Sequence, residues 1–198
     1  MDFIFIKDKD FKEFKKELSQ RLKKRPKRMI DRPGYSPAAV FILLLNKNNE
    51  AHILLTKRTD SVRTHKGQVA FPGGSWDKYD KSMLATAFRE TCEETGIKQG
   101  DIEILGEFDE FLSISDFHVN TFVGSINYPY NYKINRNEIT DIFEVPLSIF
   151  YNKEYDKIEY YREQDKDIAV YYYNFNSYLI WGLTARILTE FASKVLNG

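Results

Sequence analysis

Three carboxylates are concentrated in one short stretch of the chain, at Glu90, Glu93 and Glu94. At about 100° per residue, these side chains fall on one side of a helix, together with Thr86. The opposite side, expected to pack, consists of Leu84, Ala87, Phe88, Thr91 and Thr95. Neighbouring like charges destabilise a helix, whereas Mg²⁺ or Mn²⁺ prefers a shell of carboxylate oxygens. The residue types and their spacing therefore predict a helix that binds a divalent cation.

The flanking residues favour a ligand site over the alternative, an ordinary solvated acidic face. The helix follows the loop Phe71–Gly74, whose two glycines allow the backbone to approach a ligand closely. It stops at Gly96, a typical C-terminal cap. Arg89 precedes Glu93 by four residues, so an ion pair between them can hold the carboxylates in place. Loop, helix and glycine stop together indicate one functional unit.

The segment Gly73–Ile97 resembles the Nudix box, the signature of hydrolases that cleave nucleoside diphosphates linked to another group. The family pattern ends in Arg-Glu, an apolar residue, any residue, Glu-Glu, any residue, Gly and an apolar residue. Residues 89–97 match it, with Thr91 at the apolar position. The commonest form of the box also has a glutamate where this chain has Lys81, and the nearby carboxylates are Asp77 and Asp80. The resemblance implies metal-dependent hydrolysis of a diphosphate.

A second motif is similar to the signature of the coenzyme A pyrophosphatase branch of Nudix enzymes. It consists of Leu54, Leu55, Thr56, Lys57 and Arg58, then Arg63, Gly67 and the loop Phe71–Gly74. All spacings agree, and only Thr59 departs from the serine or alanine of the branch pattern. The similarity extends from about Pro37 to the C-terminal helix. It implies that coenzyme A or an acyl derivative is cleaved to 3′,5′-ADP and 4′-phosphopantetheine or its acyl form.

These resemblances imply roles for individual residues. Glu90, Glu93 and Glu94 would be the ligands of Mg²⁺ or Mn²⁺, and Arg89 would assist catalysis. Nudix enzymes use either a glutamate of the box or one from a later loop as the base, so Glu93 and Glu138 are both candidates. The residues expected to bind substrate are Arg58, Arg63, His65, Lys66, Gly67, Phe71, Gly73 and Gly74. A guanidinium binds phosphate oxygens in pairs, so Arg58 and Arg63 are favoured as the anion contacts. For His65 the alternative is an ordinary surface histidine.

The charge composition argues against nucleic acid and membranes as binding partners. Lys plus Arg and Asp plus Glu both number 29, so no overall field favours nucleic acid or an anionic membrane. The single Cys92 excludes an internal disulfide, and charge interrupts the first apolar residues too early for a signal peptide. We expect a cytoplasmic enzyme for a small-molecule substrate that binds neither nucleic acid nor membrane. The sequence leaves open whether two chains associate as a homodimer through the N-terminal helix.

Periodicity places both motifs in an α+β chain. Apolar residues recur at helical intervals from Asp10 to Lys27 and from Leu179 to Val195, and prolines interrupt residues 26–33. Strands are predicted at Ala38–Leu45, His52–Thr56, Ile102–Phe111, Val119–Ile126, Ile142–Val145, Ile158–Tyr161 and Ile168–Tyr173, and an Asn-rich turn joins the first two. We expect a Nudix fold over residues 35–198, a mixed β-sheet sandwiched between α-helices (α/β/α). Residues 1–34 would form an amphipathic helical extension and a linker.

Two alternative functions remain open. A Nudix pyrophosphatase for ADP-ribose, dinucleotides or nucleoside triphosphates would carry the same box, and only the Leu54–Gly74 motif argues against it. A non-catalytic Nudix ligand-binding protein typically tolerates loss of a metal carboxylate, whereas all three glutamates are present here. The tyrosines at 160, 161 and 171–173 are expected to pack between paired strands rather than stack on adenine.

Overall fold

The computed structural model of the protein describes residues 10–59, 67–163 and 166–197. Its helices are α1 (Phe11–Lys24), α2 (Met83–Thr95), α3 (Ser148–Tyr151) and α4 (Gly182–Phe191), with a 3₁₀ turn η1 (Gln99–Asp101) and a π-helical end η2 (Ala192–Leu196). Its strands are β1 (Ser36–Lys47), β2 (Glu50–Arg58), β3 (Val69–Ala70), β4 (Gly73–Ser75), β5 (Glu103–Leu112), β6 (Phe117–Ser125), β7 (Ile139–Pro146), β8 (Lys157–Glu163), β9 (Lys166–Phe175) and β10 (Tyr178–Ile180).

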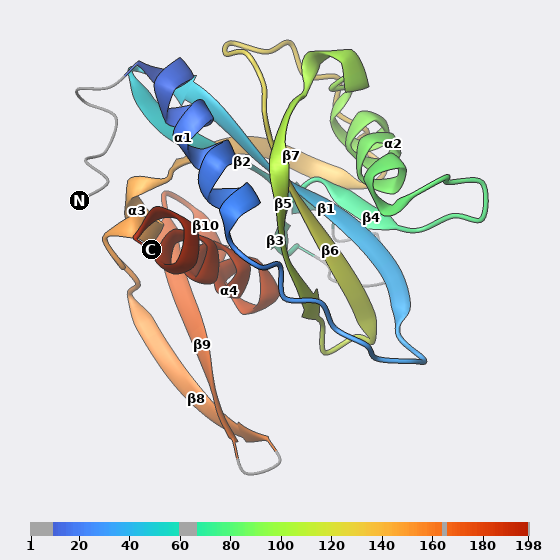
Figure 1. The fold of residues 1–198 in the computed structure, drawn as a ribbon, viewed down its shortest axis with the longest axis vertical. Coiled ribbons are helices and arrows are strands. Elements are labelled where there is room, and N and C mark those ends of the chain that lie inside the picture. The colour runs from blue at the N-terminus through green and yellow to red at the C-terminus, as the bar shows by residue number, and fades with distance from the viewer. Residues whose placement is uncertain (1–9, 60–66, 164–165, 198) are drawn as a thin grey trace.

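Within the described residues, seven strands form one mixed sheet and three form a smaller antiparallel sheet. The main path of the large sheet is β3-β2-β1-β6-β5, while β4 also pairs with β1 and β7 with β2. The central pair β1–β6 is parallel and the other pairs are antiparallel. Helix α2 covers one side of this sheet, and α1 and α4 cover the other (Figure 1). The predicted mixed sheet between helices is therefore confirmed.

Alternation along β1 explains the two layers. Ile42 and Leu44 belong to the core shared with α1 and α4, whereas Phe41, Leu43 and Leu45 pack with α2. All five side chains are completely buried. Successive side chains of a strand point to opposite faces, so a strand covered on both faces needs a continuous apolar run. The run Phe41–Leu45 meets this requirement.

The predicted N-terminal amphipathic helix is confirmed as α1. It starts after the N-cap Asp10, whose side chain accepts a hydrogen bond from the backbone of Lys12, and it buries Phe14, Leu18 and Leu22. Arg21 donates to the carbonyl oxygens of Val195 and Leu196, at 3.0 Å each, in the last turn of the chain. The apolar side of α1 is therefore covered by its own chain.

The structure confirms one predicted turn and corrects the predicted start of the C-terminal helix. The Asn-rich turn between β1 and β2 is confirmed, because Asn48 and Asn49 have φ of 55° and 60°, as a two-residue hairpin requires. The expected helix start at Leu179 is wrong. Residues 178–180 instead pair with β9 as strand β10, and α4 begins at Gly182. None of the described helices has the length and apolar character needed to cross a bilayer.

Candidate functional site

Helix α2 starts and ends at residues suited to those positions. The Ser82 side chain accepts a hydrogen bond from the backbone of Ala85 at 3.1 Å, which caps the first turn. Gly96 ends the helix in the left-handed conformation, with φ of 74°, and its N–H reaches the carbonyl of Cys92. The predicted glycine cap is confirmed. Between these ends, α2 carries Glu90, Glu93 and Glu94.

One cleft of about 710 Å³ brings together carboxylates from two distant parts of the sequence. Glu90 and Glu94 from α2 line it, and so does Glu138, which lies just before β7. The predicted substrate residues Arg58, Phe71, Gly73 and Gly74 line the same cleft. The box and the second motif thus meet at one place in the fold.

Glu94 is the most deeply buried of these carboxylates, with 1% of its surface exposed. Its Oε2 accepts a hydrogen bond from the backbone N–H of Gly73 at 3.2 Å, and Arg58 Nη1 lies 3.6 Å from its Oε1. Burial raises the pKa of Glu94 to about 8, because one N–H and one arginine do not offset the loss of water and the nearby charges of Glu90 and Glu138. Burial likewise raises the pKa of Glu90. Among the described residues, the carboxylates of this site (Glu90, Glu94 and Glu138) outnumber the arginines that pair with them (Arg58 and Arg89).

The two glycines of the Phe71–Gly74 loop are required by close contacts. A Cβ atom on Gly74 would lie 2.3 Å from Glu90 Oε2, and one on Gly73 would lie 2.3 Å from the carbonyl of Ala39. Gly73 also has φ of 143°, which residues with a side chain rarely adopt. Position 73 therefore requires glycine, whereas a side chain at position 74 would displace the Glu90 carboxylate from its place beside the loop.

Glu93 is oriented differently from the other two glutamates of α2. Its side chain is 51% exposed and its Oε2 accepts from Arg89 Nη1 at 3.1 Å, which is the ion pair expected from the sequence. It is not among the residues that line the cleft. The expectation of one acidic side is also wrong for Thr86, which is buried. Residues four apart, such as Glu90 and Glu94, share a line along a helix, whereas Glu93 is rotated away from both.

Arg89 is the centre of an ion network that contains a residue not assigned from the sequence. Asp80 accepts two hydrogen bonds from Arg89, from Nε at 3.0 Å and from Nη2 at 2.8 Å, and a third from Thr86 at 2.9 Å. The Arg89 guanidinium holds the pKa of Asp80 well below its usual range. Arg89 also donates to Glu90 Oε1 at 2.8 Å. Asp80 thus holds Arg89 in place. The sequence signal for this role was that Asp80 directly precedes Lys81, the position at which the commonest form of the box has a glutamate.

Glu138 is positioned by hydrogen bonds to both motifs. The N–H of Asn135 donates to the carbonyl of Glu94 at 2.9 Å, and the Asn135 amide donates to Glu138 Oε1 at 2.9 Å. The N–H of Thr59 donates to the carbonyl of Glu138 at 2.9 Å, and its hydroxyl donates to the carbonyl of Asn137 at 3.4 Å. Threonine at position 59 therefore retains a hydroxyl that anchors the loop carrying Glu138.

The basic residues of the second motif divide into two groups. Arg58 lines the cleft, and its buried Nε has no hydrogen-bond partner among the described residues, so it can accept an anion. Arg63, His65 and Lys66 lie outside the described residues, and their predicted role in binding stays a prediction.

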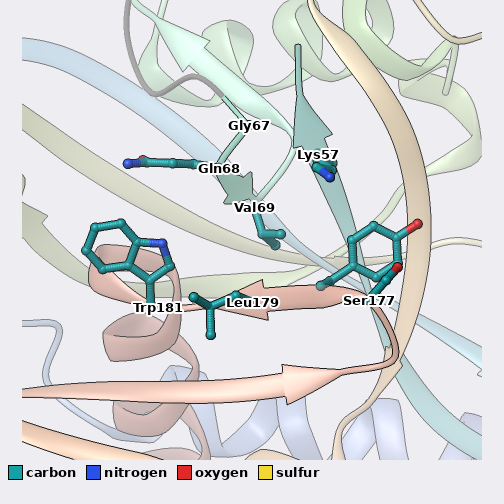
Figure 2. A pocket seen from close by; sticks show the side chains of 8 residues that line it. Lys57, Gly67, Gln68, Val69, Ser177, Leu179 and Trp181 are labelled. Atoms are coloured by element: carbon teal, nitrogen blue, oxygen red, sulfur yellow. The ribbon is translucent and has the colours of Figure 1, made fainter. Parts of the chain in front are cut away.

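Gly67 lines a second pocket of about 320 Å³, which shares Gln68, Val69 and Trp181 with the cleft. Figure 2 shows Trp181 and Gln68 on one side of this pocket and Lys57 and Ser177 on the other.

The residues present fit a hard divalent cation. Glu90, Glu94 and Glu138 line one cleft, and the described residues around the buried Glu94 do not supply enough positive charge to offset its burial. Mg²⁺ and Mn²⁺ are bound in proteins by such oxygen donors. In the described part of the chain no three acidic, histidine or cysteine side chains are already gathered as a metal cluster. Instead, Glu90 accepts from Arg89 and Glu94 accepts from Gly73.

Known proteins share both the sequence and the fold. The family model of the NUDIX domain matches residues 35–164. The chain is 37% identical to a Nudix hydrolase named NudL from Photorhabdus laumondii, over 86% of this chain and 89% of that protein. It is 33% identical to NudL from Escherichia coli, over 86% and 88% respectively. A crystal structure of a MutT/nudix family protein from Enterococcus faecalis has the same fold, with a TM-score of 0.50 and 16% identity, over 96% of this chain and 70% of that one. The chain therefore belongs to the Nudix hydrolase family.

Proposed function

We propose that this protein hydrolyses the diphosphate bond of coenzyme A or of acyl-coenzyme A, with Mg²⁺ or Mn²⁺ as cofactor. The products would be 3′,5′-ADP and 4′-phosphopantetheine or its acyl form. The proposal rests on one observation, that Glu90, Glu94, Glu138 and Arg58 line the same cleft beside the Gly73-Gly74 backbone. The Leu54–Gly74 motif supports coenzyme A as the substrate, because it resembles the coenzyme A branch and contributes several residues of this cleft.

Glu90 and Glu94 would hold the cation, with Glu138 beside them. A divalent cation supplies shielding of diphosphate charge and acidifies bound water. Arg58 would bind phosphate oxygens through its guanidinium, which lines the cleft and whose Nε has no hydrogen-bond partner among the described residues. Its attraction to Glu94 at 3.6 Å holds the arginine next to the carboxylates. The N–H of Gly73 keeps Glu94 in place, so the carboxylate does not have to be ordered when substrate arrives.

Of the two candidate bases, the geometry favours Glu138 over Glu93. Glu138 lines the cleft, and Asn135 holds its Oε1, so Oε2 is left to take a proton from the attacking water. Glu93 lies outside the cleft and is engaged by Arg89. Hydrolysis then breaks one P–O bond of the diphosphate, with the water oxygen forming the new bond to phosphorus.

Replacing each glutamate by glutamine separates the two assignments. At saturating Mn²⁺ we expect Glu138→Gln to lower kcat by about 10²- to 10⁴-fold, the usual contribution of a general base. Glu93→Gln should lower kcat by less than about tenfold, because it loses only an exposed ion pair. Retention of the wild-type rate by Glu138→Gln would exclude Glu138 as the base.

The substrate is tested by following products chromatographically with coenzyme A, dephospho-coenzyme A, ADP-ribose and NADH at equal concentrations. We expect the highest kcat/KM for coenzyme A, and we expect EDTA to abolish turnover. Higher kcat/KM for ADP-ribose than for both coenzyme A forms would overturn the substrate assignment. Absence of turnover with every compound, together with calorimetric binding of one of them, would identify a non-catalytic ligand-binding protein. Glu94→Gln serves as the control that any turnover belongs to this cleft.

A further inference from the structure

The cleft does not end at the carboxylates but continues to the β8–β9 hairpin and the start of α4. Figure 1 shows this hairpin extending away from the large sheet. The hairpin contributes Tyr161, Ile168, Val170 and Tyr172 to the lining, and α4 contributes Leu183 and Ile187. We call these six residues the apolar wall. They belong to the same continuous cleft as Glu90, Glu94 and Glu138.

The strand register explains why the hairpin presents this surface. Tyr161 lies opposite Ile168 in the β8–β9 pair, and Val170 and Tyr172 follow at alternate positions of β9. Side chains two apart in a strand share a face, so all four belong to one side of the hairpin. Tyr171 and Tyr173 belong to the other side and pack in the core with α4. The expected packing role of the tyrosine cluster thus holds for those two, while Tyr161 and Tyr172 line the cleft.

The charges in the cleft are distributed unevenly. The arginines that line it in the described part of the chain are Arg58, near the carboxylates, and Arg186, in α4. Arg186 Nε donates to Glu190 Oε1 at 3.0 Å, and Glu190 also pairs with Arg28 and Lys194. The six side chains of the apolar wall carry no charge themselves, so a phosphate placed against them would lose water without gaining a cation from the wall, which is unfavourable. An uncharged chain would instead remove apolar surface from water on both sides.

Further apolar side chains line the cleft around the turn between β5 and β6. They are Leu112 at the end of β5, Ile114 in the turn and Phe117 at the start of β6, and Ile114 is fully exposed. An exposed isoleucine beside a continuous apolar lining is suited to contact a flexible ligand. Tyr172 of the wall is parallel to Trp181, which also lines the cleft, with ring centroids 6.0 Å apart. Their stacked rings add further apolar surface to the lining.

We propose that the apolar wall binds an acyl chain carried on the sulfur of the pantetheine arm, and that it thereby sets the preference of the enzyme among thioesters. The inference rests on the proposed function, since the diphosphate of the same molecule would lie at the carboxylate end. The wall distinguishes substrates by the length of the chain, because each added methylene buries further apolar surface. The nucleotide half of the molecule does not contact it.

Kinetics with free, acetyl- and octanoyl-coenzyme A test this assignment. For the wild type we expect kcat/KM to be about tenfold higher for the octanoyl than for the acetyl form, mainly through KM. Tyr161→Asn and Ile168→Asn should reduce this ratio to about two or less, while the inhibition constant of 3′,5′-ADP stays unchanged. Tyr160→Asn is the matched control. Tyr160 is the neighbouring, 66% exposed tyrosine on the opposite face of the hairpin, so its replacement should keep the wild-type ratio.

Three outcomes would overturn the inference. These are equal kcat/KM for acetyl- and octanoyl-coenzyme A in the wild type, an unchanged ratio in both wall variants, and weaker inhibition by 3′,5′-ADP in those variants. The last outcome would place the nucleotide on the wall. If no form of coenzyme A is hydrolysed, the proposed function itself fails. Calorimetric binding of octanoyl-coenzyme A and coenzyme A to the wild type and to Ile168→Asn then still decides whether the wall binds the chain.

Discussion

Asp109 and Glu94 are both carboxylates with almost no exposed surface, at 0% and 1%, yet their surroundings carry opposite charge. Asp109 contacts Arg25 at 2.5 Å, Lys194 at 3.1 Å and the backbone N–H of Arg28 at 2.9 Å. Burial alone would raise the pKa of Asp109, but these donors outweigh it and lower the pKa below its usual value. Among the described residues, Glu94 has one backbone N–H donor and one arginine at 3.6 Å as partners, and burial raises its pKa to about 8.

The difference distinguishes a structural carboxylate, Asp109, from the carboxylate that we propose as a metal ligand, Glu94. The cations around Asp109 come from the segment after α1 and from the C-terminal end of the chain, so this carboxylate joins three distant parts of the sequence. Its neighbour Glu110 is similarly surrounded, by Lys27, His118 and the N–H of Ile30. A buried charge without such partners is unfavourable. Among the described residues Glu94 lacks such partners, and this imbalance supports the proposed cation, which would balance the charge when bound.

The largest expected effect comes from removing the functional charge. Glu94→Gln should lower kcat by about 10³-fold at saturating Mg²⁺, because a bound metal contributes several kcal/mol to catalysis. It should not destabilise the metal-free protein, because it removes an unfavourable buried charge. Steady-state kinetics and urea denaturation in EDTA measure the two effects. Loss of stability together with full activity would reverse the assignment of the two carboxylates.

Removing the structural charge should have the opposite consequence. Asp109→Ala should lower the free energy of unfolding by about 3 kcal/mol, because Arg25 and Lys194 lose their buried partner. The value of kcat should change little, because Asp109 does not line the cleft. Glu107→Ala is the control. Its side chain is 55% exposed and pairs with Lys27 at 2.8 Å, so we expect a change below about 1 kcal/mol.

The pH dependence of stability should also differ in sign. Unfolding shifts Glu94 from its raised pKa to an ordinary value near 4.5, so the unfolded state binds fewer protons between these values. In EDTA, stability should therefore fall as the pH rises from about 5 toward 8, by at most about 1.4 kcal/mol per pH unit, and Glu94→Gln should remove this slope. Asp109 has a lowered pKa, so its contribution is present above the ordinary value near 3.8 and is lost as the pH falls below it. Denaturation curves from pH 3 to 8 would contradict the comparison if Glu94→Gln kept the slope at neutral pH.

An uncharged buried group gives the smallest effect. Thr91 is completely buried, and its hydroxyl has no hydrogen-bond partner among the described residues. Thr91→Val keeps the shape of the side chain and should stabilise the protein by about 1 kcal/mol, or about 2–4 °C in Tm. Thr95→Val is the matched control, since the Thr95 hydroxyl donates to the carbonyl of Thr91 at 2.6 Å and accepts from the N–H of Ile97 at 3.2 Å. Thermal denaturation should show a lower Tm for that variant.

Much of the candidate site could be predicted because its signals are local. A helix with a glycine in the left-handed cap, the Asn-rich turn and the loop with two glycines all depend on backbone preferences over a few residues. The pairing of Arg89 with Glu93 follows from helical spacing alone. The role of Asp80 was not predictable to the same extent, because its contact with Arg89 depends on how the loop before α2 folds back onto the helix.

The amino-acid sequence by itself determined the family, the type of sheet and helices, and the residues that could bind a cation. Only the tertiary structure decided which carboxylates share a cleft. In the fold Glu94 is buried and Glu93 is exposed. The hydrogen bond from the Asn135 N–H to the Glu94 carbonyl holds the loop that carries Glu138 next to α2. It also placed the β8–β9 hairpin at the far end of the cleft. The physical reason is that burial and net charge at a site depend on neighbours distant in sequence, and no local pattern specifies those neighbours.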